Sequence, residues 1–147
     1  MLVKRAGNGK DAGAFCPRKA EAAMKLFQCQ CCGQVLHFEN TVCLRCGRTV
    51  GYLPETAEMI AVEAEGAAWY RAQHQGGAEG PGRWRFCRNW ELSACNWLIP
   101  HENDGTDFCP ACAHNRTVPD LSAPENHARW QKIEAAKRRL IYTLRAL

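Results

Sequence analysis

The stretch from Cys29 to Gly47 reads CQCCGQVLHFENTVCLRCG and sets two Cys-x2-Cys pairs ten residues apart. Cys29 pairs with Cys32 and Cys43 with Cys46, and a glycine follows each pair. This is the spacing of zinc knuckles, in which glycine lets the backbone curl so that amide N–H groups point at the thiolates. The stretch therefore predicts a zinc site closed by four thiolates, with a short strand at residues 34–38 between the pairs.

Cys31 lies inside the first pair and complicates this prediction. Exchange of Cys31 with a ligand stays open, but Cys29 and Cys32 keep the x2 spacing and place Gly33 directly after the second thiol. We therefore leave Cys31 out of the site. We expect it to be a tolerated surface side chain rather than a reactive thiol.

A second set of four cysteines follows further along the chain: Cys87 and Cys95 are separated by seven residues, and Cys109 and Cys112 by two. This set also predicts a four-thiolate zinc site, although its first gap is irregular. His101 and His114 are alternative ligands, and we expect both to be surface residues. Four thiolates leave no open position for a substrate, so both predicted zinc ions are structural.

The chain has 147 residues, enough for one ordinary domain or two very small ones that need metal to fold. No segment is apolar enough for a membrane span, and no secretory signal precedes the cysteines. We therefore expect a cytoplasmic protein with reduced thiols, which favours metal over disulfides.

The net charge of +4 is unevenly distributed. Residues 1–28 and 122–147 each carry six Lys/Arg against two Asp/Glu, whereas residues 29–121 carry seven against eleven. The middle is therefore at −4, and two zinc–tetrathiolate centres would each add a formal −2. Because nucleic-acid binding needs a cationic face, this charge argues against a nucleic-acid role for the cysteine-rich region.

We expect five regions along the chain. Residues 1–23 read as a disordered tail or an over-extended gene start, with Cys16 as an incidental thiol. The others are a first zinc-ribbon module at 24–54, a connector at 55–86, a second zinc module at 87–121 and a helix at 122–147. Strands are predicted at 59–64, 68–71, 83–86 and 95–100, with a glycine-rich loop at 76–82. The fold class is a small zinc-stabilised, mainly β protein with a C-terminal amphipathic helix.

The predicted helix begins with a capping box, Ser122 to Glu125, that places a proline in the first turn. Its long apolar side chains form one stripe: Trp130, Ile133, Leu140, Ile141, Leu144 and Leu147. We expect this stripe to pack on protein. The basic side chains off the stripe could instead bind an acidic partner or a nucleic-acid backbone.

The sequence contains none of the catalytic signatures that we considered. The histidines lack the HExxH spacing that binds catalytic zinc on a helix, and there is no phosphate-binding loop, dinucleotide fingerprint or nucleophile elbow. We therefore expect this chain not to be an enzyme by itself.

Several segments together resemble one bacterial family, the zinc-ribbon-containing zinc-binding metallopeptidases. The resemblance lies in MKLFQC (24–29), CGQ (32–34), FENT (38–41), CLRCG (43–47), GYLP (51–54), CNWL (95–98), the Cys109–Cys112 pair, NRTVPDL (115–121) and EAAKRRL (134–140). It covers about residues 24–147. It implies an N-terminal metal-binding module ahead of a protease domain that carries HExxH and that this chain lacks, so that the chain would be truncated.

The resemblance implies a scaffolding or recognition role for a missing catalytic domain that packs on the helix at Trp130–Leu147. Two alternatives stay open. One is a stand-alone zinc-ribbon adaptor that presents the same apolar stripe to a protein partner. The other is a nucleic-acid-binding zinc ribbon, which the acidic middle of the chain disfavours.

Overall fold

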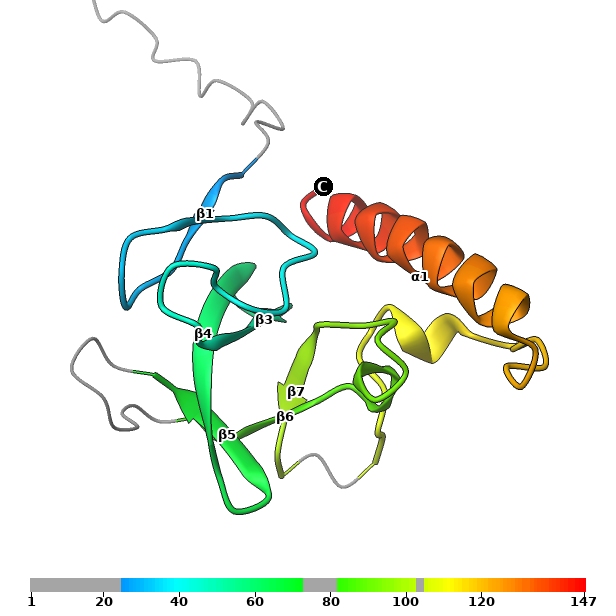
Figure 1. Cartoon of the computed structure of the whole chain (residues 1–147), viewed down its shortest axis with the longest axis horizontal. Coiled ribbons are helices and arrows are strands. Elements are labelled where there is room, and N and C mark those ends of the chain that lie inside the picture. The colour runs from blue at the N-terminus through cyan, green and yellow to red at the C-terminus, as the bar shows by residue number, and fades with distance from the viewer. Residues whose placement is uncertain (1–24, 73–81, 103–104) are drawn as a thin grey trace, which may run out of the picture.

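The structure is a computed structural model that describes residues 25–72, 82–102 and 105–147. Cys16, the predicted tail and most of the predicted glycine-rich loop lie outside these residues. Within the described part, most strands are short, and one long helix, α1 (Pro124–Arg145), follows them at the end of the chain (Figure 1). The predicted fold class is confirmed. No described helix has the length and apolar character that crossing a membrane requires.

The first zinc module contains a small antiparallel ribbon. β1 (Phe27–Gln28) pairs with β2 (Val35–Leu36), and Phe27 lies opposite Leu36. Gly33 and Gly47 have φ angles of 74° and 70°. Their amides each donate a 2.8 Å hydrogen bond to the carbonyl of the first cysteine of the preceding pair. Glycine is favoured at both positions because a Cβ opposes this left-handed conformation.

A five-stranded antiparallel sheet connects this ribbon to the second cysteine set. Its order is β3 (Thr49–Leu53), β4 (Glu58–Glu65), β5 (Ala68–Arg71), β6 (Trp84–Phe86) and β7 (Leu98–Pro100). Three of its strands match those predicted at 59–64, 68–71 and 83–86, but β7 begins three residues later than the predicted strand at 95–100. The sheet takes strands from both predicted zinc modules and from the connector.

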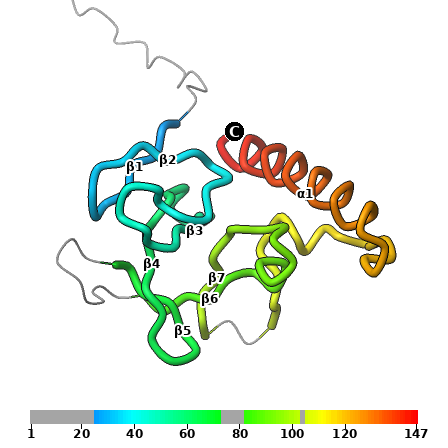
Figure 2. Tube along the Cα trace, in the orientation of Figure 1, coloured from blue at the N-terminus to red at the C-terminus, as the bar shows by residue number. Residues whose placement is uncertain are grey.

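The two outer strands of the sheet meet at Tyr52. This residue forms a parallel bridge with Trp97, and its N–H donates to the Asn96 carbonyl at 2.8 Å. A Cβ on Gly51 would lie 2.7 Å from Leu98 Cγ, so glycine allows β3 and β7 to approach closely. The sheet therefore curls back on itself (Figure 2), and residues of both zinc modules belong to one hydrophobic core.

An aromatic cluster lies at the centre of this core. Tyr52 and Trp97 are both fully buried, with ring centroids 4.9 Å apart. Phe38 from the first module packs on Tyr52 at 5.0 Å and on Tyr142 of α1 at 4.9 Å. The cluster thus joins the first module, the sheet and the helix. On the other sheet face, a smaller group of buried residues around Ile60 and Leu98 is covered by half-buried tryptophans.

The helix begins and packs differently from the prediction. The predicted capping box is wrong: the N-cap is Ala123, which makes no side-chain cap bond, and the Ser122 hydroxyl donates to Asp120 instead. Pro124 does occupy the first turn. The single apolar stripe is also wrong, because Trp130 is buried whereas Leu140 is 58% exposed. The buried helix residues are Trp130, Glu134 and Arg138, so the inward face is largely polar.

Candidate metal centres

The first predicted cysteine set converges on one point. The sulfurs of Cys29, Cys32, Cys43 and Cys46 all lie within 4.8 Å of one another. Cys29 and Cys46 are 3.8 Å apart and Cys32 and Cys43 are 3.5 Å apart, measured between Sγ atoms. Thiolates at the corners of a tetrahedron, each about 2.3 Å from zinc, lie about 3.8 Å apart. The four thiols therefore fit a tetrahedral zinc ion.

Burial and hydrogen bonding act unequally on these thiols. Burial raises the pKa of Cys29 to about 12. The backbone N–H of Gln34 stabilises the Cys32 thiolate, but burial and neighbouring thiols raise its pKa overall. Burial also opposes ionisation of Cys46, yet hydrogen bonds from the Arg48 backbone, neighbouring thiols and the Arg48 side chain lower its pKa to about 6. Zinc binding must therefore displace protons from Cys29 and Cys32, whereas Cys46 is already largely ionised at neutral pH.

Cys31 is not part of this group of four, as the spacing predicts, but the expectation of a surface side chain is wrong. Cys31 is only 3% exposed. Its thiol donates to the Ala72 carbonyl at 3.3 Å. The neighbouring Gln30 side chain bonds to the N–H and C=O of Ala61 at 2.9 and 2.8 Å. Residues 30 and 31 thus fix the first knuckle on the sheet, which is a long-range contact that local spacing does not reveal.

The second predicted set also converges, and all four of its cysteines are buried. Cys95 and Cys109 sulfurs are 3.7 Å apart. Backbone amides point at the sulfurs as predicted for a knuckle: the Cys109 N–H donates to Cys87 at 3.4 Å and the Cys112 N–H to Cys109 at 3.4 Å. Neither His101 nor His114 belongs to this or the first group. The chemistry of the site is again that of a closed four-thiolate shell.

A short 3-10 helix, η1 (Arg88–Trp90), explains the irregular seven-residue gap in this set. The Trp90 N–H donates to the Cys87 carbonyl at 2.7 Å, and the Ala94 N–H donates to the Asn89 carbonyl at 3.0 Å. These bonds fold the gap into a compact turn that returns Cys95 to Cys87. This longer turn therefore brings the two cysteines together, as a two-residue gap does in a zinc knuckle.

Protons are unevenly shared among the second set of thiols. Hydrogen bonds from Cys109, Cys112 and Cys95 hold the pKa of Cys87 well below its usual range. Hydrogen bonds to neighbouring thiols, together with burial, raise the pKa of Cys95 and Cys109. A hydrogen bond from Cys109 lowers the pKa of Cys112 to about 7. This site, too, holds two thiols that must lose protons when metal binds.

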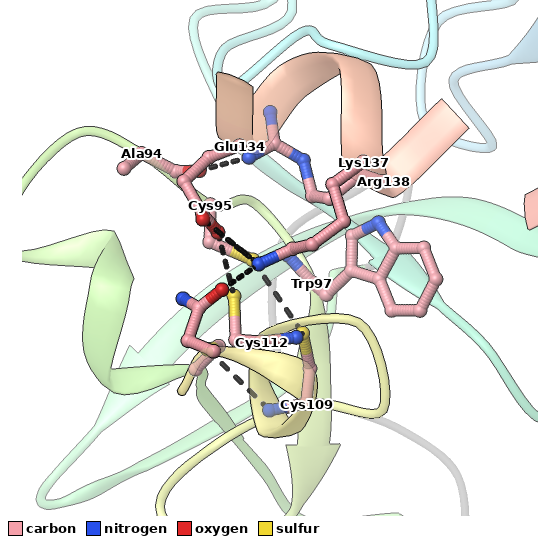
Figure 3. A network of polar contacts seen from close by, with 10 residues as sticks. Ala94, Cys95, Trp97, Cys109, Cys112, Glu134, Lys137 and Arg138 are labelled. Carbon is pink, nitrogen blue, oxygen red and sulfur yellow. Dashed lines mark hydrogen bonds and ion pairs between the residues drawn. The ribbon is translucent and has the colours of Figure 1, made fainter. Parts of the chain in front are cut away.

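A buried polar network that no sequence pattern predicted connects this second site to α1 (Figure 3). Glu134 is 2% exposed, and its Oε2 lies 3.7 Å from the Cys112 sulfur. Lys137 donates to both carboxylate oxygens of Glu134, at 2.8 and 2.7 Å, and also bonds to the Asn115 side chain. Because zinc-bound thiolates are negative, the Lys137 ammonium offsets the carboxylate charge beside them.

Arg138 adds a second cation on the same side of the helix. It is 6% exposed and donates a hydrogen bond to the Ala94 carbonyl, directly before Cys95. The charged residues between 134 and 139 are the part of the sequence that could have indicated this network. They would face solvent if the helix packed by its apolar side chains. They form an inward face because the surface beneath them is a polar, anionic zinc site.

Two closed four-cysteine sites in a small β framework define a zinc-ribbon protein, and the two sites are those of two structural zinc ions. The zinc-ribbon domain family matches residues 26–123, and this chain belongs to that family.

The relatives that the chain resembles are mycobacterial. Uncharacterized proteins of Mycobacterium tuberculosis and Mycobacterium bovis are each 30% identical to it over 124 residues, which is 84% of this chain and 31% of the relative. The chain therefore spans about a third of the length of these proteins. No solved structure matches it significantly.

Proposed function

We propose that this chain is the structural zinc-binding module of a longer zinc metallopeptidase, non-catalytic by itself, and that α1 orients the remainder of that protein. The closed thiolate shells support the non-catalytic part of the proposal, since neither zinc has an open position for water or substrate. The greater length of the mycobacterial relatives supports the modular part.

The observation that carries the proposal is the outer stripe of α1, which we define as Ile133, Leu140 and Leu144. Their exposed fractions are 63%, 58% and 54%. These residues are spaced seven and four apart, so they lie along one side of the helix. The inward face is formed by Trp130, Glu134 and Arg138. A row of exposed long aliphatic side chains on a well-formed helix is typical of a surface that another protein element covers.

A chimera tests the docking role. The matched segment of the M. tuberculosis relative is replaced by residues 24–147 of this chain, and thermal unfolding is compared between the chimera and the isolated chain. Leu140→Ser with Leu144→Ser should destabilise the chimera and leave the isolated chain nearly unchanged. Leu44→Ser, at a side chain that is 90% exposed on the first module, serves as the matched control. Equal stability of the stripe variant and the control in the chimera would contradict the docking role.

Peptidase assays test the catalytic part. The zinc-loaded chain should not hydrolyse a casein substrate, with or without excess zinc. Turnover that persists after purification to a single species would contradict the non-catalytic assignment.

The outer stripe also supports the adaptor alternative, in which a separate protein covers it. The module and the adaptor differ in whether the covering element belongs to the same protein or to a separate one. An adaptor binds a dedicated partner through Leu140 and Leu144 when the chain is used alone as bait, whereas a module stabilises the remainder of its own protein in cis.

A further inference from the structure

A groove of about 380 Å3 lies between α1 and the segment that leads into it from the second zinc site. Its lining includes the apolar side chains of Trp130 and Ile133, together with Lys137 and its partner Glu134. Arg116 from the incoming segment and Arg129 from the helix also line the groove. The groove meets the outer stripe only at Ile133.

The groove carries two positive charges that nothing in the described part of the chain neutralises. Arg116 and Arg129 are exposed, and neither makes an ion pair or side-chain hydrogen bond with a described residue. By contrast, the Arg48 and Arg83 side chains each have a carboxylate partner. The one carboxylate that lines the groove, Glu134, has both oxygens bonded to Lys137. The groove therefore favours an anionic ligand.

The backbone along one wall of the groove is also free. Asn115 has an extended backbone, residues 115–120 form no helix, strand or turn, and neither Thr117 nor Val118 uses its N–H or C=O in a hydrogen bond with a described residue. Extended backbone with unused donors and acceptors is the surface on which an extended peptide adds as a further strand. This feature distinguishes a peptide ligand from an isolated anion.

We propose that this groove binds an extended acidic segment of a partner protein. Carboxylates of the segment pair with Arg116 and Arg129, an apolar side chain between them rests on Trp130, and its backbone lies along residues 116–118. A nucleic-acid backbone fits less well, because it needs a longer row of cations, and the region from residue 29 to residue 121 is at −4. The proposal does not depend on the docking role of the outer stripe.

The test measures binding of a fluorescein-labelled peptide to the full zinc-loaded chain by fluorescence anisotropy. The peptide carries four acidic residues around a central leucine. The acidic peptide should bind, and its amide version, with glutamine and asparagine at the acidic positions, should not. Arg116→Gln and Arg129→Gln should each weaken binding about tenfold, because each removes a charge-assisted pair. Arg88→Gln is the matched control, since Arg88 is exposed and its side chain is also unpaired among the described residues.

Three results would overturn the proposal. The first is equal weakening by Arg88→Gln, which would indicate non-specific attraction. The second is no binding of the acidic peptide to a chain whose zinc content and unfolding are normal. The third is tighter binding of a single-stranded DNA of equal charge that the Arg116 and Arg129 variants abolish. Because the Leu140 and Leu144 variants leave this groove intact, failure here is distinguishable from failure of the proposed function.

Discussion

Replacing Lys137 by methionine should destabilise the chain strongly, because it leaves a buried carboxylate beside a metal thiolate. Glu134 is 2% exposed, and its Oε2 is 3.7 Å from the Cys112 sulfur. Two unit charges at that separation repel by about 4 kcal/mol at an effective dielectric constant of about 20. Removing one partner of a buried ion pair typically costs about 3–5 kcal/mol. We therefore expect Lys137→Met to lower the free energy of unfolding of the zinc-loaded chain by about 3–4 kcal/mol.

The measurement is urea unfolding followed by tryptophan fluorescence, with the zinc-to-protein ratio determined alongside. Lys132→Met is the matched control, since Lys132 is exposed on the same helix, and its cost should stay within about 0.5 kcal/mol. The double variant Glu134→Leu with Lys137→Met should recover most of the loss, because no charge is then left unpaired. A single variant as stable as the control, or a double variant no better than the single, would refute the electrostatic reasoning.

Three further predictions follow from the core and the sites. Asn96 donates to the carbonyls of Phe38 and Asn40 at 2.7 and 3.1 Å, so Asn96→Ala should lower the free energy of unfolding by about 2 kcal/mol in the same urea assay. Gly51→Ala should lower the melting temperature because its Cβ would meet Leu98 at 2.7 Å, whereas Gly105→Ala, with no atom within 4 Å, should not. Each zinc site contains at least two thiols that are protonated at neutral pH, so zinc affinity should fall at least about 100-fold for each unit by which the pH is lowered from 8. The loss should become steeper at the second site below about pH 7, because Cys112 then also binds a proton, and at the first site below about pH 6, because Cys46 does; competition with a chromogenic chelator measures both slopes.

Opposite outcomes would separate these arguments. If Asn96→Ala left the free energy of unfolding unchanged, the hydrogen bonds of Asn96 between the two modules would make no net contribution to stability. Equal melting temperatures for the two glycine variants would contradict the close approach of β3 and β7. A zinc affinity independent of pH would mean that the thiols are ionised before metal binds.

The cysteine groups and most of the sheet strands could be predicted from the sequence because their determinants are local, although β3 was not predicted. A Cys-x2-Cys pair followed by glycine specifies its own turn, and Gly33 and Gly47 adopt the left-handed backbone conformation that the spacing implies. β4 and β5 lie on either side of a tight turn at Gly66 and Ala67, which again is a local pattern. At the second site, seven residues separate the first two cysteines instead of two, and η1 folds this longer gap so that Cys95 returns to Cys87.

The orientation of α1 could not be predicted in the same way. The apolar stripe suggested an inward face containing Leu140, but which face packs depends on the surface beneath, and that surface is assembled from distant residues. It consists of an anionic zinc site under Glu134 and Lys137 and an aromatic ring, Phe38, under Tyr142. The burial of Cys31 depends in the same way on Ala72, which is 41 residues away.

The contacts of the C-terminal helix explain why its sequence is basic. Six Lys/Arg lie between residues 122 and 147, and four of them bond to the rest of the chain or to Glu134. These are Lys137 to Glu134, Arg138 to the Ala94 carbonyl, Arg139 to Glu39 and Arg145 to the Pro54 carbonyl. Three of these cations therefore bond directly to the body of the chain, and Lys137 also bonds to Asn115, so most of the basic side chains of the helix help to hold it in place. Of the two cations that remain, Lys132 and Arg129, only Arg129 lines the groove beside Arg116. The contacts that hold the helix in place thus leave Arg129 unpaired among the described residues, at the position where we propose that an acidic segment binds.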